Sequence, residues 1–236
     1  MSQNEVLIAS AQAEVDEKIQ IYKGKKVSEL KELLGMAHKD NKASFVQLAL
    51  KLMRIKGNKF ELCDGQINAL LKTVRLTGMG KPAEAMSFMP VNFEEWVSDT
   101  YWESSSLFTY FNEKVLVFFI FQQYPSGKRV DDDEMTFLGV KVWKMSDYDL
   151  THGLKEIWSE VRYLIKQNKL EITSLEQRNG RIVNKNNLPS SKFNELGHLR
   201  PGAKNGSDKL LLPTGQRIVK QRFWFNVKYV EEIISL

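Results

Sequence analysis

The chain has 236 residues, 42% hydrophobic and 11% aromatic, a composition typical of a globular protein with a sizeable core. A single cysteine, Cys63, excludes an internal disulfide and a multi-cysteine zinc site, and the three histidines are too scattered to suggest metal ligands. No signal peptide and no apolar run of membrane-spanning length is recognised, so we expect a cytoplasmic protein that does not enter a membrane.

Positive charge is concentrated in the C-terminal quarter of the chain. Between Arg178 and Lys228 there are eleven basic residues and two acidic ones, whereas the remainder has 23 basic and 27 acidic residues. Such an asymmetry predicts contact with a polyanion. A solvated basic face without a partner is the alternative interpretation.

The first part of the chain is expected to be helical. Apolar residues recur at helical spacing over residues 4–23, 27–34 and 42–55, and a glycine follows each run. We therefore predict a helical segment over residues 1–57 that packs on a main domain of residues 58–236.

The middle of the chain predicts a sheet. Residues 68–77 and 84–91 are expected to be strands joined by a turn at the sequence GMGKP. The apolar run 115–122 suits a central strand covered on both faces, and the alternating run 137–145 should pair with it. The acidic residues 130–134 are interpreted as a solvated turn rather than a metal site, because three consecutive carboxylates cannot converge on one ion.

A long amphipathic helix is predicted over residues 146–167, with Asp147 or Asp149 as its cap. Its core-facing stripe is expected to consist of Leu154, Ile157, Trp158, Val161 and Ile165.

The last part of the chain is expected to be mostly irregular. Residues 179–215 are rich in Asn, Gly, Ser and Pro and are predicted to form a loop, followed by a strand over 216–225 and a short helix over 227–235. The predicted fold class is α/β (α+β), with a mixed central sheet flanked by helices and an N-terminal helical layer.

Two basic motifs in the C-terminal quarter predict phosphate contacts. In HLRPGAKNG, Arg200 and Lys204 flank a Pro201-Gly202 turn that lets the backbone approach a ligand closely, and Asn205 follows. Arginine offers a planar fork that fits phosphate oxygens or a guanine edge.

The second motif, LPTGQRIVKQRFWF, places a turn at Gly215 before a basic strand. On that strand we expect one face to carry Arg217, Val219 and Gln221, and the other to carry Ile218, Lys220 and Arg222. An ordinary basic edge strand is the alternative, because lysine protects edges from aggregation. Together, inside the basic segment, the two motifs make nucleic-acid binding the leading hypothesis.

These motifs resemble the MutH family of GATC endonucleases. The family's Glu-Leu-Lys-Thr strand, and its Gly-Arg-Pro-x-Glu sequence six residues later, are matched by Lys72-Thr73 and by Gly80-Lys81-Pro82-Ala83-Glu84. Its Trp-Glu-Thr/Ser is matched by Trp102-Glu103-Ser104, and its helix tryptophan by Trp158. Its Arg-Pro-Lys-Ala-x-Asn loop is matched by Arg200 to Asn205. Its Leu-Pro-x-Gly turn with a following lysine is matched by Leu212 to Gly215 and by Lys220. The similarity extends from about residue 42 to the last residue.

The chain resembles still more closely the second half of the two-domain restriction endonucleases of the Sau-three-A type, through MSF, FEEW, WES, NGRIVNKN, LPTG and KQRFWFN. This resemblance implies a MutH-like fold that binds double-stranded GATC DNA and regulates without cutting. It further implies a catalytic MutH-like domain as partner, in the same chain or as a separate fragment, and Mg²⁺ as a cofactor of the parent type II enzyme, with none for this chain. Together with the basic motifs, it predicts DNA contacts at Lys72, Lys81, Arg200, Pro201, Gly202, Lys204, Asn205, Gly215, Arg217 and Lys220.

The acids with which this family holds Mg²⁺ beside its lysine are missing. Cys63 and Leu70 stand nine and two residues before Lys72, and residues 41–57, which should supply a third acid, contain no Asp or Glu, with Gln47 as the nearest polar candidate. The apolar side chain of Leu70 disfavours the ion and its hydration water, so we predict no catalytic residues and no metal site.

Two alternatives stay open. A shifted set of Asp64, Lys72 and Glu84 would make the chain an active Mg²⁺-dependent GATC endonuclease. A protein-interaction module would instead use exposed aromatic residues, for which the candidates are Trp96, Tyr101, Trp102 and residues 223–225. The competing expectation is that these aromatic residues fill the core.

Overall fold

The computed structural model describes residues 2–37, 44–98, 101–180, 182–203 and 205–235. It is a mixed α/β structure that divides into two compact units. Unit 1 comprises Met1–Glu84, Glu113–Met145 and Glu231–Leu236, and unit 2 comprises Ala85–Asn112 and Ser146–Val230. Within the described ranges, none of the helices combines the length and the apolar character that crossing a bilayer requires.

Unit 1 is built on a mixed four-stranded sheet. Its strands are β1 (Lys59–Leu62), β2 (Ile67–Leu76), β4 (Val115–Gln122) and β5 (Thr136–Lys144), in the order β1-β2-β4-β5. The β2 and β4 strands are parallel, whereas β1 and β5 pair antiparallel with their neighbours. The apolar run of β4 is buried along almost its whole length, which confirms the predicted central strand and its pairing with β5. The short strand β1 was not anticipated from the sequence.

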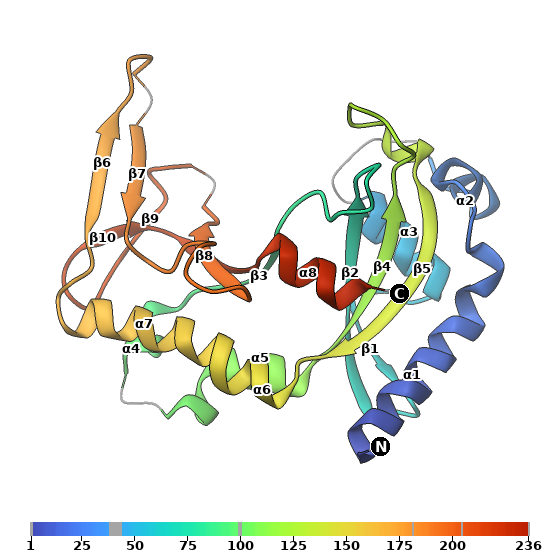
Figure 1. The fold of residues 1–236 in the computed structure, drawn as a ribbon, viewed down its shortest axis with the longest axis horizontal. Helices are drawn as coiled ribbons and strands as arrows, with labels where there is room; N and C mark the ends of the chain where they lie inside the picture. Colours follow the sequence, from blue (N-terminus) through green and yellow to red (C-terminus); the bar gives the residue numbers. More distant parts are fainter. Residues whose placement is uncertain (1, 38–43, 99–100, 181, 204, 236) are drawn as a thin grey trace. The chain divides into compact units, whose positions relative to one another are not determined.

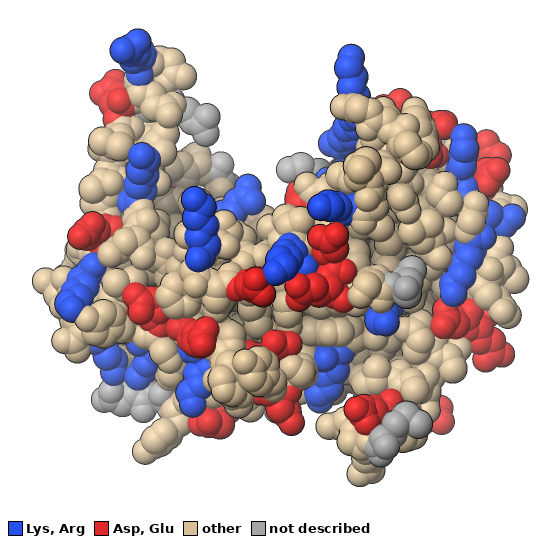
Figure 2. Space-filling view, viewed as in Figure 1, with Lys and Arg blue, Asp and Glu red and all other residues tan. Residues whose placement is uncertain are grey.

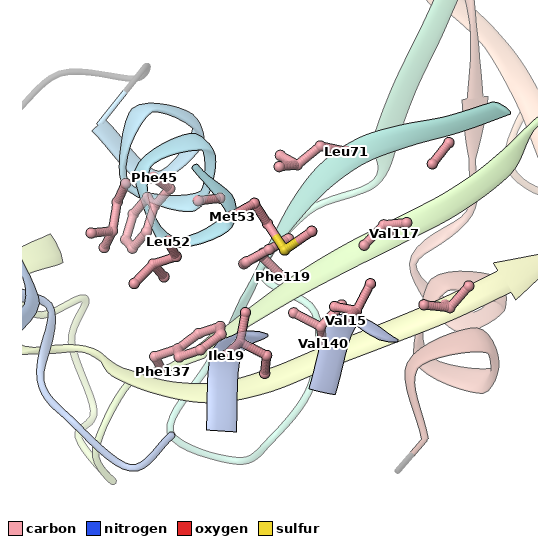
Figure 3. Packing of buried hydrophobic residues seen from close by; sticks show 14 of the residues in the cluster. Val15, Ile19, Phe45, Leu52, Met53, Leu71, Val117, Phe119, Phe137 and Val140 are labelled. Atoms are coloured by element: carbon pink, nitrogen blue, oxygen red, sulfur yellow. The ribbon is translucent and has the colours of Figure 1, made fainter. Parts of the chain in front are cut away.

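Helices α1 (Gln3–Ile19), α2 (Val27–Leu33) and α3 (Ser44–Met53) belong to unit 1, with a 3-10 turn at Gln20–Tyr22 after α1 (Figure 1). They confirm the three predicted helices, although the predicted start of the third, at residue 42, lies outside the described residues. The cluster in Figure 3 shows how α1 and α3 pack on one face of the sheet, through Val15, Ile19, Phe45, Leu52 and Met53 against Leu71, Val117, Phe119, Phe137 and Val140.

A capping box and one glutamine explain the position of α1. The Ser2 hydroxyl accepts a hydrogen bond from the Glu5 amide, and the Glu5 carboxylate accepts one from the Ser2 amide. Further along, Gln12 donates to the Val140 carbonyl and accepts from the Val142 amide. These bonds satisfy the outer edge of β5, which would otherwise present unpaired backbone groups.

Unit 2 contains a long helical segment and several short helices. After α6 (Asp147–Asp149) and a π-helical turn (Leu150–Leu154) comes α7 (Lys155–Lys166), and the predicted apolar stripe of this segment is buried. Ser146 caps the segment by accepting from the Asp149 amide, so the prediction that Asp147 or Asp149 is the cap was wrong. The remaining helices are α4 (Phe93–Val97), a 3-10 turn (Trp102–Ser104), α5 (Ser106–Glu113) and the first half of α8 (Val227–Ile234), whose residues from Glu231 onward belong to unit 1.

Three small antiparallel sheets complete unit 2. The strands β3 (Met86–Pro90), β11 (Gln221–Phe225) and β8 (Gly197–Pro201) form one in the order β3-β11-β8. The other two sheets are β9 (Lys209–Leu211) with β10 (Arg217–Val219), and β6 (Ile172–Glu176) with β7 (Ile182–Asn186).

These sheets correct three predictions. Residues 179–215 are not one loop, because β7, β8 and β9 lie within them. The strand predicted over 216–225 is interrupted at Lys220, and its halves β10 and β11 belong to different sheets. The strands predicted on either side of GMGKP exist as β2 and β3, but they too lie in different sheets and do not form a hairpin.

Candidate nucleic-acid interface

The three-stranded sheet of unit 2 has one aromatic face and one basic face. Side chains alternate along a strand, so Phe223 and Phe225 point to one side of β11 while Arg222 and Trp224 point to the other. The phenylalanines are fully buried and pack with Phe88, whose ring centroid lies 4.4 Å from that of Phe225. The opposite face is therefore the one that can present charge.

Arg200 lies on this basic face because β8 pairs Arg200 with Arg222 and His198 with Trp224. The guanidinium carbon of Arg200 is 4.8 Å from the centroid of the Trp224 ring. Arg200 is exposed, whereas Arg222 is half-buried and donates to the Phe88 carbonyl at 2.6 Å. The Trp224 ring thus holds Arg200 through a cation–π contact, and the planar guanidinium of Arg200 stays accessible.

The turn after Arg200 has a structural reason for its glycine. The Gly202 amide donates to the Lys220 carbonyl at 2.9 Å, which continues the pairing beyond β8. A Cβ atom at Gly202 would lie 2.5 Å from Cγ of Arg222. Glycine at this position therefore makes room for the Arg222 stem. Pro201 before it is exposed, and Lys204 lies outside the described residues.

Asn205 shapes the loop with its side chain. Its Oδ1 accepts from the Ser207 amide, the Ser207 hydroxyl and the Asp208 amide, at 3.0, 2.6 and 3.2 Å. Asp208 in turn forms an ion pair with Lys220, with 2.6 Å between Oδ1 and Nζ. The predicted contact residue Asn205 thus positions the partner of another predicted contact residue.

The sequence Leu212 to Gly215 forms the expected turn. Gly215 has a φ of +83° and its amide donates to the Leu212 carbonyl at 2.9 Å, a backbone conformation that favours glycine. The turn joins β9 to β10 and leaves Arg217 exposed on β10. The predicted shared faces hold only within each strand, since the chain breaks at Lys220 between β10 and β11.

Four basic side chains of the segment from β8 to β11 are considered together: Arg200 on β8, Arg217 on β10, Lys220 between β10 and β11, and Arg222 on β11, here called the basic cluster. Three of them are exposed and Arg222 is half-buried. The predicted contacts Lys72 and Lys81 belong to unit 1 instead, where Lys72 lies half-buried on β2 and Lys81 is exposed in the loop after it.

His198 is a buried polar residue of this face to which sequence reasoning gave no role. Its Nδ1 is 2.6 Å from Oδ1 of Asn226. Because Asn226 uses its Nδ2 to donate to the Asn194 carbonyl at 2.8 Å, its Oδ1 must accept and Nδ1 of His198 carries the hydrogen. Burial lowers the pKa of His198, and the charge of Arg200 lowers it further, while the Asn226 bond opposes the shift.

The structure does not assemble the alternative active site of Asp64, Lys72 and Glu84. Asp64 lies in the turn before β2, and the strand rises about 16 Å from Ile67 to Lys72. Glu84 forms an ion pair with Arg75 at 2.8 Å, and Arg75 projects from the face of β2 opposite to Lys72. The shifted site is thus contradicted by the positions of both acids.

The surroundings of Lys72 are apolar. Its cross-strand partner is Phe118, and Leu70, with 4% of its surface exposed, shares its face of β2. The helix α3 packs on the other face of the sheet, and Gln47 on that helix is exposed. Leu70 and Phe118 supply no oxygen ligand for Mg²⁺ beside Lys72. Among the described residues, no group of three or more His, Cys, Asp or Glu side chains is placed to hold a metal ion.

The acidic turn between β4 and β5 is less solvated than predicted. Asp132 is buried and pairs with Arg129 at 3.0 Å and with Arg75 at 3.8 Å, while Asp133 pairs with the buried Lys31. The expectation of a solvated turn was wrong for Asp132, because Arg75, distant in the sequence, and the nearby Arg129 both pair with it.

The aromatic candidates for a protein-interaction surface mostly fill the core. Trp96, Trp102, Phe223 and Phe225 are buried, and Trp224 is half-buried beside Arg200. Tyr101 is the exception, with 82% of its surface exposed. One exposed tyrosine does not provide the contiguous apolar surface that a stable protein interface requires.

Comparison of the chain with models of known protein families finds none that matches, and comparison with curated protein sequences finds no match either.

Proposed function

We propose that this chain is a double-stranded DNA-binding domain with a MutH-like fold, which regulates a type II restriction endonuclease and does not itself cut DNA. The observation that carries the proposal is the basic cluster, in which Arg200 is exposed over the Trp224 ring and Arg217 and Lys220 are exposed as well. A planar guanidinium held by an indole is suited to bidentate contacts with phosphate oxygens or with a guanine edge.

The members of the basic cluster have different proposed roles. Arg200 contacts a base edge or a phosphate, and Arg217 and Lys220 neutralise phosphates. Arg222 supports them, because its stem packs on Gly202 and its head is bonded to the Phe88 carbonyl. Phosphate contacts of this kind supply affinity and register, whereas base contacts supply sequence preference.

The proposed lack of hydrolysis is supported by the environment of Lys72. Phosphodiester cleavage by a metal-dependent nuclease requires carboxylates beside the lysine. Leu70 occupies the neighbouring position on the same face of β2, and Asp64 and Glu84 lie elsewhere. In this proposal Mg²⁺ and the catalytic residues belong to a second, catalytic MutH-like domain, in the same chain or as a separate fragment.

The proposed recognition sequence, GATC, is supported only by the sequence resemblance. The test is fluorescence anisotropy with a labelled GATC duplex and a scrambled duplex over a series of salt concentrations. If Arg200, Arg217 and Lys220 contact phosphates, the slope of log K against log salt should be about −2.7. A preference for the GATC duplex supports the sequence assignment. Absent or salt-independent binding would overturn the proposal.

A cleavage assay tests the other half of the proposal. A supercoiled plasmid with GATC sites, incubated with an excess of the protein and Mg²⁺, should stay intact. Nicked or linear product that disappears in Asp64→Ala or Glu84→Ala would restore the endonuclease alternative.

A further inference from the structure

The hairpin of β6 and β7 stands apart from the core of unit 2. Within the part of the chain that the structure describes, the two strands form a sheet of their own. Most of their residues are exposed, including Leu175 and Ile182, with 50% and 61% of their surfaces accessible. Leu175 and Ile182 project from opposite faces, because Leu175 is paired with Val183. An isolated two-stranded hairpin is marginally stable in water, so contacts outside its own two strands are needed to hold it.

The base of the hairpin is anchored to the elements that carry the basic cluster. Asn187 accepts from the Glu171 amide at 2.9 Å and donates to the Lys169 carbonyl at 3.0 Å, which closes the base. Gln216, next to β10, donates to the Leu170 carbonyl at 3.2 Å. The hairpin is thus fixed at one end beside Arg217.

A second anchor reaches the loop that contains Asn205. The side-chain Nδ2 of Asn184 donates to the Gly206 carbonyl at 3.5 Å, and Oδ1 of Asn184 accepts from the Ser174 hydroxyl at 2.8 Å. A Cβ atom at Gly206 would lie 3.0 Å from Nδ2 of Asn184. These contacts join the hairpin to the loop whose Asp208 pairs with Lys220.

The far end of the hairpin is basic and polar. The hairpin as a whole, residues 172–186, contains three basic residues and one acid, Glu176. The turn is closed by the Gly180 amide, which donates to the Gln177 carbonyl at 2.8 Å, with Gly180 at a φ of +76°. Figure 2 shows Lys and Arg atoms at the tip of the hairpin and lower along it, with acidic atoms just below the tip. A polyanion is the partner that this charge favours.

We infer that the β6–β7 hairpin is a DNA-reading arm that enters the major groove beside the phosphates held by the basic cluster. The major groove, about 12 Å wide, admits a two-stranded ribbon. Arg178 and Lys185 would contact phosphates or guanine, Asn179 has the amide that pairs with adenine, and the exposed Leu175 and Ile182 suit thymine methyl groups. The inference rests on the proposed function, because it assigns a second DNA-contacting element to the same domain.

The experiment shortens the arm and leaves its base intact. Residues 176–182 are replaced by Asn-Gly, a two-residue turn that suits the directly paired Leu175 and Val183. Arg178→Ala is the point variant, and Lys192→Ala, an exposed lysine outside the hairpin, is the control of equal charge. Circular dichroism and thermal unfolding identify variants that fold like the wild type.

The expected result is that the shortened variant binds the GATC duplex roughly tenfold more weakly, whereas Lys192→Ala binds as the wild type does. In Arg178→Ala the slope of log K against log salt should become shallower by about 0.9. Protection of guanine N7 from dimethyl sulfate should be lost on part of the site in the shortened variant, because N7 faces the major groove.

The outcomes separate the two proposals. Wild-type protein that does not bind duplex DNA would overturn the proposed function and the arm with it. Wild-type protein that binds, with unchanged affinity and salt slope in the hairpin variants, would overturn only the arm. An equal loss of affinity in Lys192→Ala would show that the effect comes from net charge and not from the arm. Unchanged N7 protection in the shortened variant would show that the hairpin does not enter the major groove.

Discussion

The guanidinium of Arg200 lies over the indole of Trp224, with 4.8 Å between Cζ and the ring centroid. The two residues come from neighbouring strands, and the β8–β11 register brings them to the same face. A cation held against a ring in this way loses less conformational freedom when it binds a ligand than a free side chain does. In the proposed function, the pairing therefore holds Arg200 in position before DNA binds.

We expect Arg200→Ala to weaken binding to the GATC duplex by about 1–3 kcal/mol. Arg200→Lys should recover only part of this loss, because lysine has no planar fork. Arg162, which lies over Trp158 at 4.2 Å but donates to backbone carbonyls, is the matched control. Arg162→Ala should lower thermal stability and leave the affinity of the folded protein unchanged. Equal affinity of Arg200→Ala and wild type in anisotropy titrations would place the interface elsewhere.

The ion pair between Lys220 and Asp208 predicts a variant that binds DNA more tightly. In Asp208→Asn the ammonium group is no longer neutralised by a carboxylate 2.6 Å away, so affinity for any duplex should rise. The pair is largely exposed, so the free energy of unfolding should change by less than about 1 kcal/mol. Lys220→Ala should have the opposite effect on affinity and flatten the salt slope by about 0.9. A loss of affinity in Asp208→Asn contradicts the phosphate role of Lys220.

Because His198 is buried, we predict that the free energy of unfolding depends on pH. Because burial lowers its pKa in the folded protein, the unfolded chain binds the proton more readily. The contribution of neutral His198 to stability is therefore complete above about pH 6.5 and declines as the pH falls below that value. Urea unfolding at pH 7.5 and pH 5 should show a smaller pH dependence in His198→Gln than in wild type. Identical pH dependence would show that His198 does not titrate differently in the two states.

Because Leu70 is buried among apolar residues, we predict that a carboxylate introduced at this position will not create a metal site. Leu70→Glu places a carboxylate at a position with 4% exposure beside Leu116 and Phe118, and should lower the free energy of unfolding by about 3 kcal/mol or more. Leu70→Met, similar in volume, should cost less than about 1.5 kcal/mol. Plasmid DNA should remain intact with Mg²⁺ and either variant. Cleavage by Leu70→Glu would show that the remaining ligands are already in place.

The loop after β2 has no room for a side chain at Gly78. A Cβ atom there would lie 2.8 Å from Cα of Pro125 and 2.9 Å from the Ser126 nitrogen, both backbone atoms that cannot rotate away. Gly78→Ala should therefore lower the free energy of unfolding by about 1–3 kcal/mol. Gly127→Ala, in the facing loop and with nothing within 4 Å, is the control and should be neutral or slightly stabilising. Equal unfolding midpoints of the two variants would count against the close packing of these loops.

The elements that the sequence predicted well are those with strong local periodicity. The stripe from Leu154 to Ile165 and the apolar run of β4 carry their own signal, because burial of one helix face or of a whole strand shapes the composition. Short strands such as β8 and β9 lie in Asn- and Gly-rich sequence, and their partners are distant or follow a turn. Composition alone does not reveal such pairing.

The candidate interface was predictable in its residues and not in its geometry. The excess of basic residues identified Arg200, Arg217 and Lys220, but the stacking of Arg200 on Trp224 depends on the strand register. The break at Lys220 was hidden, because an alternating strand continues through it in the sequence. The hairpin of β6 and β7 also escaped, although Asn179-Gly180, followed by the β-branched Ile182 and Val183, was a usable turn signal.

The parallel pairing of β2 with β4 has a consequence for biosynthesis. Ala69 is paired with Val115, so the sheet of unit 1 closes only after the 28 residues of unit 2 between them have left the ribosome. Until then β2 is paired only with β1. Afterwards the segment VLVFFIF must pair with β2 quickly, because an uncharged β-prone run of this kind associates with other copies of itself. We expect nascent chains arrested after β4 but before β5 to be the species that molecular chaperones hold most strongly.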